Sequence, residues 1–173
     1  MINPKVILVN DNDEVIGFED KLVAHQKGLK HRAISVLLFN EKGEWLLQKR
    51  AFNKYHSGGL WTNTCCSHPF PKENTQASAE RRLMEEMGMK SDLNYLFDFS
   101  YCVKLDNELT ENELDHVFIG KSEKLPILNK EEACDYRYIS SEALGKEIHD
   151  QPENFTEWFK IIFDKLKTIY YDY

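Results

Sequence analysis

A broad apolar stripe near the end of the chain limits the fold more than any other segment. It places eight large apolar side chains at helical spacing: Phe155, Trp158, Phe159, Ile162, Phe163, Leu166, Ile169 and Tyr170. A helix with so wide an apolar face is stable only when that face is removed from water. We therefore predict that this helix covers one face of a β-sheet.

Short β-type runs supply the strands for such a sheet. They occur at residues 6–10, 33–39, 45–49, 95–103 and 113–119, with clusters of turn residues between them. One clear helix interrupts them, beginning near Asn74, carrying Ala79, Leu83 and Met87 on one face and ending at Gly88. Strands and helices interleaved in this way predict an α/β (α+β) domain, with central mixed β-sheets flanked by helices.

The length and composition favour one globular unit. The chain has 173 residues, of which 42% are hydrophobic, and we find no internal repeat or linker-like segment, so we expect a single domain over residues 1–173. Its longest apolar stretches, such as residues 6–9 and 36–39, are far shorter than the ~20 residues that a membrane span needs. The first residues show no basic region followed by a long apolar run, so we expect a cytoplasmic protein.

The charge and the cysteine content exclude further classes of protein. A net charge of −7 argues against a broad nucleic-acid-binding surface, so any anionic ligand must meet a local cluster of basic residues. The four cysteines show no C-x-x-C spacing and are too few for a disulfide framework. We expect Cys65, Cys66, Cys102 and Cys134 to be free thiols.

The segment from Gly58 to Pro69 is small, polar and rich in nucleophiles. Adjacent residues on a strand point to opposite faces, so only one of Cys65 and Cys66 can face a cleft, and His68 shares the face of Cys66. Taken alone, the segment is explained more simply by a strand over residues 61–66 whose cysteines fill the core, where free cysteines are common and inert.

Residues 67–89 closely resemble the Nudix box, a loop–helix–loop that holds divalent cations against a diphosphate. The resemblance rests on Ser67, Glu73 and the run Arg81-Arg82-Leu83-Met84-Glu85-Glu86-Met87-Gly88-Met89. The helix sets Arg82 and Glu86 on one face, and the adjacent Glu85 and Glu86 repel unless cations or arginines compensate. Without the surrounding spacing, an ordinary charged helix surface would explain these residues.

Two positions depart from that box. Ser67 stands where the box has its first glycine, and Arg82 stands where it has the first glutamate of R-E-x-x-E-E. Losing that carboxylate weakens the cation cluster that hydrolysis requires.

Carboxylates and histidines offer a further site. Strand alternation puts Glu111 and Glu113 on one face, roughly 6.5 to 7 Å apart along the strand, where they could clamp a metal or share a proton. A charged sheet edge is the simpler alternative for this segment alone. His25, His31 and His68 lie near polar or turn features, whereas His56, His116 and His149 have no clear partner. Three histidines and two carboxylates could hold a divalent metal, although spacing does not establish that they converge.

Taken in order, residues 62–69, the altered box and Glu111-Asn112-Glu113 resemble type I isopentenyl-diphosphate isomerases, a Nudix-fold family. The resemblance spans residues 21–158, and a generic Nudix hydrolase would not share the two flanking segments. It implies interconversion of isopentenyl and dimethylallyl diphosphate in isoprenoid biosynthesis, by an allylic proton shift through a carbocation-like intermediate.

The resemblance also implies roles for particular residues. One divalent metal, Mn²⁺, Zn²⁺ or Mg²⁺, would be surrounded by His25, His31, His68, Glu111 and Glu113, while Glu86 would bind a Mg²⁺ that touches the substrate diphosphate. Cys66 and Glu113 would transfer protons, with Tyr101 assisting Glu113. The diphosphate would be held by Lys21, Arg50, Lys54 and Arg82 beside the Ser67 backbone, and Trp158 would face the carbon skeleton.

The expected partner is therefore a small isoprenoid diphosphate, with no nucleic acid and no membrane, bound by a monomer or weak homodimer. Two alternatives stay open at this point. Glu73, Glu85 and Glu86 also fit a Nudix hydrolase of a nucleoside diphosphate derivative. The histidines and carboxylates also fit a structural metal site in a binding protein.

Overall fold

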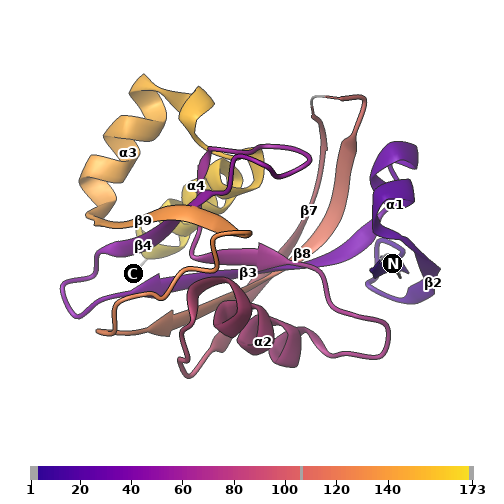
Figure 1. Cartoon of the computed structure of the whole chain (residues 1–173), viewed down its shortest axis with the longest axis horizontal. Coiled ribbons are helices and arrows are strands. Elements are labelled where there is room, and N and C mark those ends of the chain that lie inside the picture. Colours follow the sequence, from indigo (N-terminus) through magenta and orange to yellow (C-terminus); the bar gives the residue numbers. More distant parts are fainter. Residues whose placement is uncertain (1–3, 106, 172–173) are drawn as a thin grey trace.

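A mixed nine-stranded sheet forms the centre of the computed structural model, with helices on both faces (Figure 1). The structure describes residues 4–105 and 107–171, with side chains described as far as residue 168. The elements in chain order are β1 (Lys5–Val9), β2 (Val15–Asp20), α1 (Lys21–Lys27), β3 (His31–Phe39), β4 (Trp45–Arg50), β5 (Trp61–Thr62), β6 (Cys65–Ser67), α2 (Thr75–Met87), β7 (Asn94–Lys104), β8 (Thr110–Lys121), β9 (Ala133–Ile139), α3 (Ser141–Asp150), a 3-10 turn (Pro152–Asn154) and α4 (Glu157–Tyr171). The predicted layered fold is confirmed.

Strand β3 organises the sheet. It pairs in parallel with β8 along its whole length, from His31 opposite Glu113 to Phe39 opposite Lys121. On its other edge, β1, β6 and β4 pair with it in turn, all antiparallel. Strands β6 and β8 therefore flank β3 from opposite sides, and side chains from both can reach one region above it.

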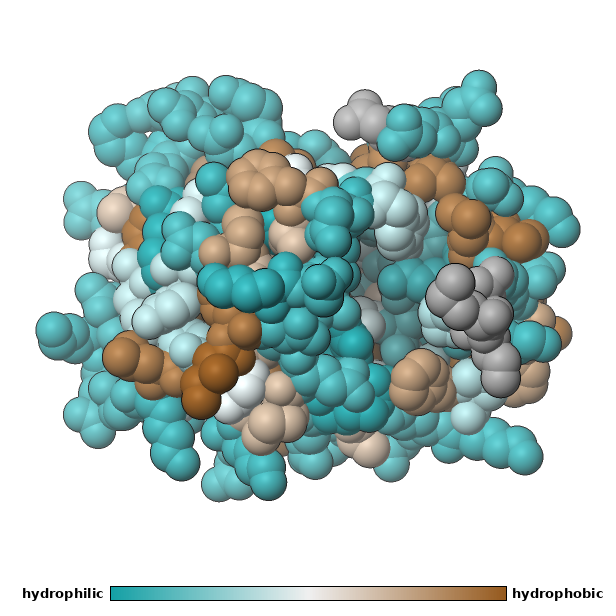
Figure 2. All heavy atoms as spheres, viewed as in Figure 1, coloured by the Kyte–Doolittle hydropathy of each residue, from teal (hydrophilic) through white to brown (hydrophobic). Residues whose placement is uncertain are grey.

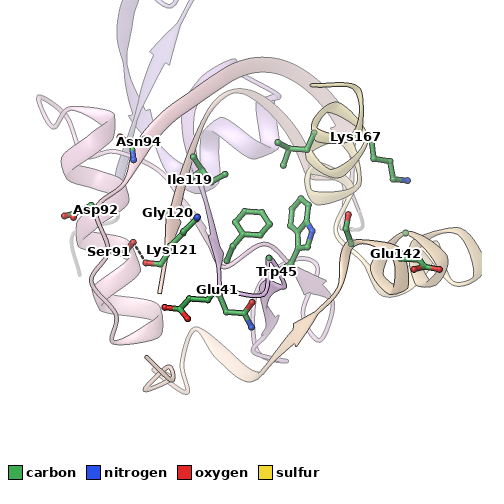
Figure 3. A pocket seen from close by; sticks show the side chains of 16 residues that line it. Glu41, Trp45, Ser91, Asp92, Asn94, Ile119, Gly120, Lys121, Glu142 and Lys167 are labelled. Carbon is green, nitrogen blue, oxygen red and sulfur yellow. Dashed lines mark hydrogen bonds between the residues drawn. The ribbon is translucent and has the colours of Figure 1, made fainter. Parts of the chain in front are cut away.

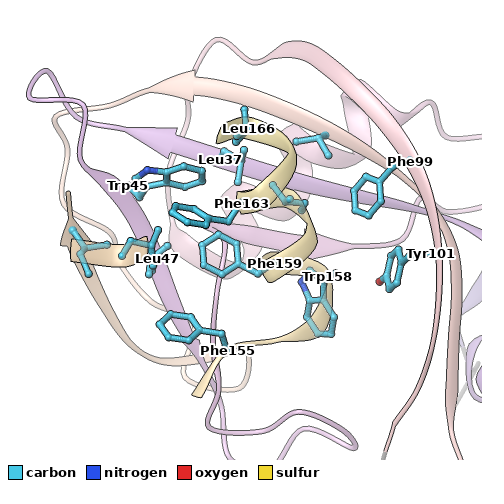
Figure 4. Packing of buried hydrophobic residues seen from close by; sticks show 14 residues of the cluster. Leu37, Trp45, Leu47, Phe99, Tyr101, Phe155, Trp158, Phe159, Phe163 and Leu166 are labelled. Atoms are coloured by element: carbon cyan, nitrogen blue, oxygen red, sulfur yellow. The ribbon is translucent and has the colours of Figure 1, made fainter. Parts of the chain in front are cut away.

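The apolar stripe near the end of the chain packs as predicted. Helix α4 buries Trp158, Phe159, Ile162 and Phe163 against one sheet face. Figure 4 shows Trp158, Phe159 and Phe163 in this cluster. Phe155 joins this cluster but lies before the helix, because the 3-10 turn at residues 152–154 sets it in extended backbone beside Trp61. The side chains of Ile169 and Tyr170 lie outside the described part of the chain.

Helix α2 covers the opposite face of the sheet. Its Ala79, Leu83 and Met87 pack against Ile34 and neighbouring residues of β3 in a second, separate cluster. The predicted ends are confirmed: the Asn74 side chain accepts a hydrogen bond from the Ala77 amide, and Gly88 adopts the left-handed backbone, with φ of 63°, that a glycine accommodates without strain.

The predicted strand over residues 61–66 is interrupted at two residues. The Asn63 side-chain amide donates to the carbonyls of Val36 and Cys65. The Thr64 hydroxyl donates to the Leu46 carbonyl and accepts from the Leu38 amide. Side chains thus replace part of the backbone ladder, so the segment forms β5 and β6 separately.

Five elements in the described part of the chain have no counterpart in the sequence prediction: β2, α1, β9, α3 and the 3-10 turn. Helix α1 has only seven residues, too few for a clear apolar period, and the Asp20 side chain caps its start. No helix in residues 4–105 or 107–171 is long and apolar enough to cross a membrane. Figure 2 shows mostly hydrophilic side chains on the face viewed, with hydrophobic residues in small separate groups.

Candidate active site

Two adjoining cavities bring most of the predicted site residues together. The inner one, about 40 Å³, is lined by residues that include Cys66, Tyr101, Glu111, Glu113 and Trp158. The outer one, about 240 Å³, opens over α2 and the loop of residues 51–60. Both are bordered by the same five residues: Lys21, Arg50, Cys66, Ser67 and His68. One continuous site can therefore receive a ligand with two chemically different ends.

Three histidines and a carboxylate meet beside the inner cavity. Ligand atoms of His25, His31, His68 and Glu113 all lie within 4.8 Å of one another, although the residues come from α1, β3, the end of β6 and β8. The parallel register of β3 and β8 sets His31 directly opposite Glu113. Imidazole and carboxylate donors gathered in this way fit a divalent transition metal.

The orientation of the imidazoles also fits a metal. Nδ1 of His25 lies 2.7 Å from the Lys21 carbonyl, and Nδ1 of His31 lies 2.7 Å from the Leu29 carbonyl. A carbonyl can only accept, so each Nδ1 carries the proton and each Nε2 keeps its lone pair. Among the described residues, Nε2 of His31 makes no hydrogen bond and lies buried 3.3 Å from Oε1 of Glu113, as two ligands of one cation would.

Burial keeps His25 and His68 neutral, which is the form that binds metals. It lowers the pKa of His25 to about 4, with the neighbouring His31 adding to the effect, and it holds the pKa of His68 well below its usual range.

The lowered pKa of His25 predicts acid sensitivity of the metal-free protein. Unfolded His25 titrates near 6.5 and folded His25 near 4, so the unfolded chain binds more protons between these values. The free energy of unfolding should fall as pH drops from 6.5 to 4, by roughly 3 kcal/mol for this residue. Urea unfolding of chelator-treated wild type and H25Q across this range would measure it. Equal slopes for the two proteins would contradict the prediction.

The two adjacent cysteines point to opposite faces, as predicted. Cys65 is fully buried in the core beneath α2, whereas Cys66 borders both cavities together with His68. Burial raises the pKa of the Cys66 thiol to about 12, although the Arg50 guanidinium, 3.8 Å from its Sγ, works in the other direction. Cys66 therefore holds its proton at neutral pH. All four cysteines are free thiols, as expected.

The two glutamates of β8 face the inner cavity, so the interpretation of this segment as a charged sheet edge is wrong. Glu111 and Glu113 are only 4% and 5% exposed. The Tyr101 hydroxyl lies 2.5 Å from Oε2 of Glu113 and 3.1 Å from Oε2 of Glu111. Burial beside Glu113 raises the pKa of Glu111. Burial also opposes the charge of Glu113, but His31 and His68 hold its pKa below the usual range.

The outer cavity is strongly basic in a chain that is acidic overall. Six cationic side chains and two carboxylates border it: Lys5, Lys21, Arg50, Lys54, Arg81, Arg82, Glu86 and Glu132. Burial, together with the nearby charges of Arg50, Lys54 and Arg82, lowers the pKa of Lys21. Such mutual repulsion is relieved by a multiply charged anion. The local basic cluster that an anionic ligand requires is present.

Arg82 is held by carboxylates at the rim of the outer cavity. It bonds to Glu86 at 2.7 Å, to Glu85 at 2.7 Å and to Glu132 at 3.1 Å. The other oxygen of Glu86 accepts from Gln48 at 2.8 Å. The predicted pairing of Arg82 and Glu86 on one helix face is confirmed, and the arginine compensates the adjacent glutamates.

Trp158 borders the inner cavity and belongs to the core at the same time. It is 3% exposed, and its Nε1 donates to the Asn63 side chain at 3.2 Å. The Arg50 guanidinium lies 5.3 Å from its ring centre. The apolar stripe of α4 thus supplies one wall of the site.

Several site residues were missed from the sequence. Glu132 forms an ion pair with Lys54 as well as with Arg82. Asp115 borders the inner cavity, where burial raises its pKa to about 8, and it continues the alternation of Glu111 and Glu113, a signal that could have revealed it. His56 lies 3.4 Å from Glu111, and no pattern around it indicates this contact.

The remaining histidines lie outside these cavities. His116 pairs with Asp13 at 3.0 Å, a partner that the sequence did not reveal, and His149 is exposed on α3. A larger cavity, about 1,110 Å³, lies at the other end of β3, between residues such as Trp45 and Lys167 (Figure 3). Its described lining includes none of the predicted site residues and no histidine or cysteine. Its size alone does not make it a reaction site.

Comparison with known proteins gives a consistent result. The NUDIX domain model matches residues 29–159. "Isopentenyl-diphosphate Delta-isomerase" of Pectobacterium atrosepticum is 46% identical, with 94% of this chain and 90% of that protein covered. "Isopentenyl-diphosphate Delta-isomerase 2" of Photorhabdus laumondii is 47% identical, with 93% and 91% covered.

Solved structures share the fold at lower sequence identity. A crystal structure of the protein DR0079 of Deinococcus radiodurans superposes with a TM-score of 0.70 at 19% identity, covering 85% of this chain and 90% of that one. A MutT protein of Methanosarcina mazei gives 0.67 at 20% identity, covering 80% and 94%. These likenesses bear on the fold alone, whereas the sequence relatives are similar over nearly the whole chain. This chain therefore belongs to the isopentenyl-diphosphate Delta-isomerase family, within the NUDIX superfamily.

Proposed function

We propose that this protein interconverts isopentenyl diphosphate and dimethylallyl diphosphate. The observation that carries the proposal is the meeting of the Cys66 thiol and the Glu113 carboxyl at one cavity, reached from strands on opposite sides of β3. The basic outer cavity adjoins it, which supports binding of a substrate with a diphosphate at one end and a short hydrocarbon at the other.

The reaction moves a double bond by adding one proton and removing another. A proton added to the terminal methylene carbon leaves a tertiary cation, and loss of a proton from the carbon nearer the diphosphate forms the new double bond. Cys66 is protonated at neutral pH, so it can donate, and Glu113 can accept on the other side. Tyr101 holds Glu113 in place through its hydroxyl. An enclosed cavity is required because water would capture the cation.

The histidine and carboxylate side chains that would bind a metal support the proposed role of Glu113. His25, His31, His68, Glu111 and Glu113 would hold one divalent ion, Mn²⁺, Zn²⁺ or Mg²⁺, and such an ion would orient the carboxylate and lower its affinity for a proton. The buried Nε2 of His31, which faces Oε1 of Glu113 at 3.3 Å without a hydrogen bond, supports the assignment.

The diphosphate serves as an anchor in this proposal. Lys21, Arg50, Lys54 and Arg82 border the outer cavity and would hold it beside Ser67, with a Mg²⁺ between the diphosphate and Glu86. Binding energy from this end would orient the hydrocarbon at the reacting groups. Trp158 would face the transient cation, where a desolvated cation–π contact contributes about 2 kcal/mol.

Arg50 and its neighbour Lys49 provide a matched test of the anchor. Arg50 points into both cavities, whereas Lys49 lies over the rings of Phe52 and Trp61 outside them. R50Q should raise KM roughly 10- to 100-fold, the effect of losing a hydrogen bond to a charged group. K49Q should leave KM within about twofold. Steady-state kinetics on both variants would measure this, and an equal effect of the two changes would argue against the proposed anchor.

One assay separates the proposed isomerase from a hydrolase. Purified protein with Mg²⁺ and Mn²⁺ is incubated with isopentenyl diphosphate, and the products are separated by chromatography. Formation of dimethylallyl diphosphate supports the proposal. Release of phosphate from this substrate or from nucleoside diphosphate derivatives, without isomerisation, would overturn it. Arg82 favours the first outcome, because it stands where a hydrolase has a metal-binding glutamate and pairs instead with Glu86.

A further inference from the structure

His56 enters the site from a tightly folded loop. It is 6% exposed, and its ring stacks on His25 with 5.8 Å between ring centres. The loop after it is compact: Ser57 has a positive φ of 51°, and a Cβ on Gly58 would come within 2.7 Å of the Phe52 carbonyl oxygen. Positive φ at a residue other than glycine is held only where surrounding structure requires it. The chain thus holds His56 inside the site.

The ring of His56 is oriented toward Glu111. Its Nδ1 lies 3.2 Å from the Ser57 hydroxyl, which leaves Nε2 directed at Oε1 of Glu111, 3.4 Å away. This separation is longer than the 2.7–2.9 Å typical of a charge-assisted hydrogen bond. Two ligand atoms at such a distance are spaced about as neighbouring ligands around one metal ion, where bonds of ~2.1 Å at right angles place donors ~3 Å apart.

Two donor sets overlap at His25. Ligand atoms of His25, His56 and Glu111 lie within 4.8 Å of one another, as do those of His25, His31, His68 and Glu113. Because Nδ1 of His25 is bonded to the Lys21 carbonyl, only its Nε2 can bind a metal, and one lone pair binds one ion. The two sets of ligand atoms therefore fit one shared ion better than they fit two independent ions.

We infer that His56 is a further ligand of this ion and binds it together with His25 and Glu111. The ion then has four imidazoles and two carboxylates around it, and the imidazole-rich set favours Zn²⁺, Co²⁺ or Ni²⁺ over Mg²⁺. This inference rests on the metal site of the proposed function, but it does not depend on the isomerisation reaction. Its alternative is a His56 that only orients Glu111 by a hydrogen bond.

Titration of metal-free protein with Co²⁺ tests the inference without any turnover. Two quantities would be compared among wild type, H56A, H56Q and H149A. The first is the dissociation constant of Co²⁺, measured by competition with a chromophoric chelator, and the second is the visible absorption of bound Co²⁺. H56A and H56Q should both weaken Co²⁺ and Zn²⁺ binding tenfold or more and alter the absorption bands. H149A removes an exposed histidine on α3 and should change neither quantity.

The glutamine variant decides between ligand and orienting group. Its side-chain amide can still donate a hydrogen bond to Glu111 but is a poor ligand for Co²⁺. Wild-type affinity and absorption in H56Q would overturn the inference and leave His56 as an orienting group. Because H56Q keeps a polar side chain of similar reach, it provides the test even where H56A fails to fold. Absence of isomerisation by a wild type that binds Co²⁺ through His56 would overturn the proposed function alone.

Discussion

Replacing Cys66 by alanine is expected to lower kcat for isomerisation by roughly 10³-fold, within the range that a positioned acid or base contributes. The thiol is the protonated group on its side of the inner cavity, and alanine removes it with little change in volume. The fold should persist, because Cys66 lies at the cavity wall. Product formation by chromatography and thermal unfolding would measure the two effects. Substantial turnover by C66A would exclude Cys66 from proton transfer.

The neighbouring cysteine provides the control. Cys65 lies on the opposite face of β6, buried under α2, so C65A should cost on the order of 1 kcal/mol of stability and leave kcat nearly unchanged. C102A, at an exposed cysteine, should change neither. The opposite pattern, with activity lost in C65A and kept in C66A, would mean that the reacting thiol is Cys65, on the face of the sheet that α2 covers.

Replacing Glu113 by glutamine should also lower kcat by roughly 10³-fold or more, because glutamine cannot accept the proton that Glu113 is proposed to take. The carboxylate also contacts His31 and His68, so metal affinity should fall as well. Measuring kcat at saturating metal separates the two effects. If E113Q regained the wild-type kcat when saturated with metal, Glu113 would be only a metal ligand and not the group that accepts the proton.

Glu111 and Glu108 give graded controls for this variant. Glu111 shares the inner cavity and the Tyr101 contact, but it is not proposed to take the proton, so E111Q should lose metal affinity and retain more kcat than E113Q at saturating metal. Glu108 is exposed in the turn before β8, and E108Q should be indistinguishable from wild type. A larger kcat loss in E111Q than in E113Q would reverse the assigned roles.

The sequence predicts the parts of the fold that carry strong periodicity. Helix α2 follows from its cap at Asn74, its apolar face and Gly88, and α4 follows from its wide apolar stripe. Helix α1 is too short for a clear apolar period. The break at Asn63 follows from side-chain hydrogen bonds across the sheet, which local patterns do not contain. Phe155 lies outside α4 for a similar reason, because the turn before it decides the helix start.

The same distinction separates the site residues that the sequence predicts from those that it does not. Residues fixed by strand alternation, such as Cys66 and Glu113, could be assigned to faces directly from the sequence, and Asp115 could have been added by the same rule. His56 and Glu132 could not, because each reaches the site from a loop whose path depends on tertiary contacts. Convergence of His25, His31 and His68 likewise depends on the register of β3 against β8 and on the position of α1.

In the proposed reaction, a thiol and a carboxyl group exchange protons with the two ends of an allylic unit. Isomerisation in deuterium oxide, with protein equilibrated in that solvent, measures this exchange when the product is followed by nuclear magnetic resonance. We expect dimethylallyl diphosphate with one deuteron in a methyl group after the first turnover of wild type, and almost no product from C66A over the same time. Product formed by wild type without deuterium would mean that hydrogen moves within the substrate, and it would rule out proton exchange with the thiol and the carboxyl group.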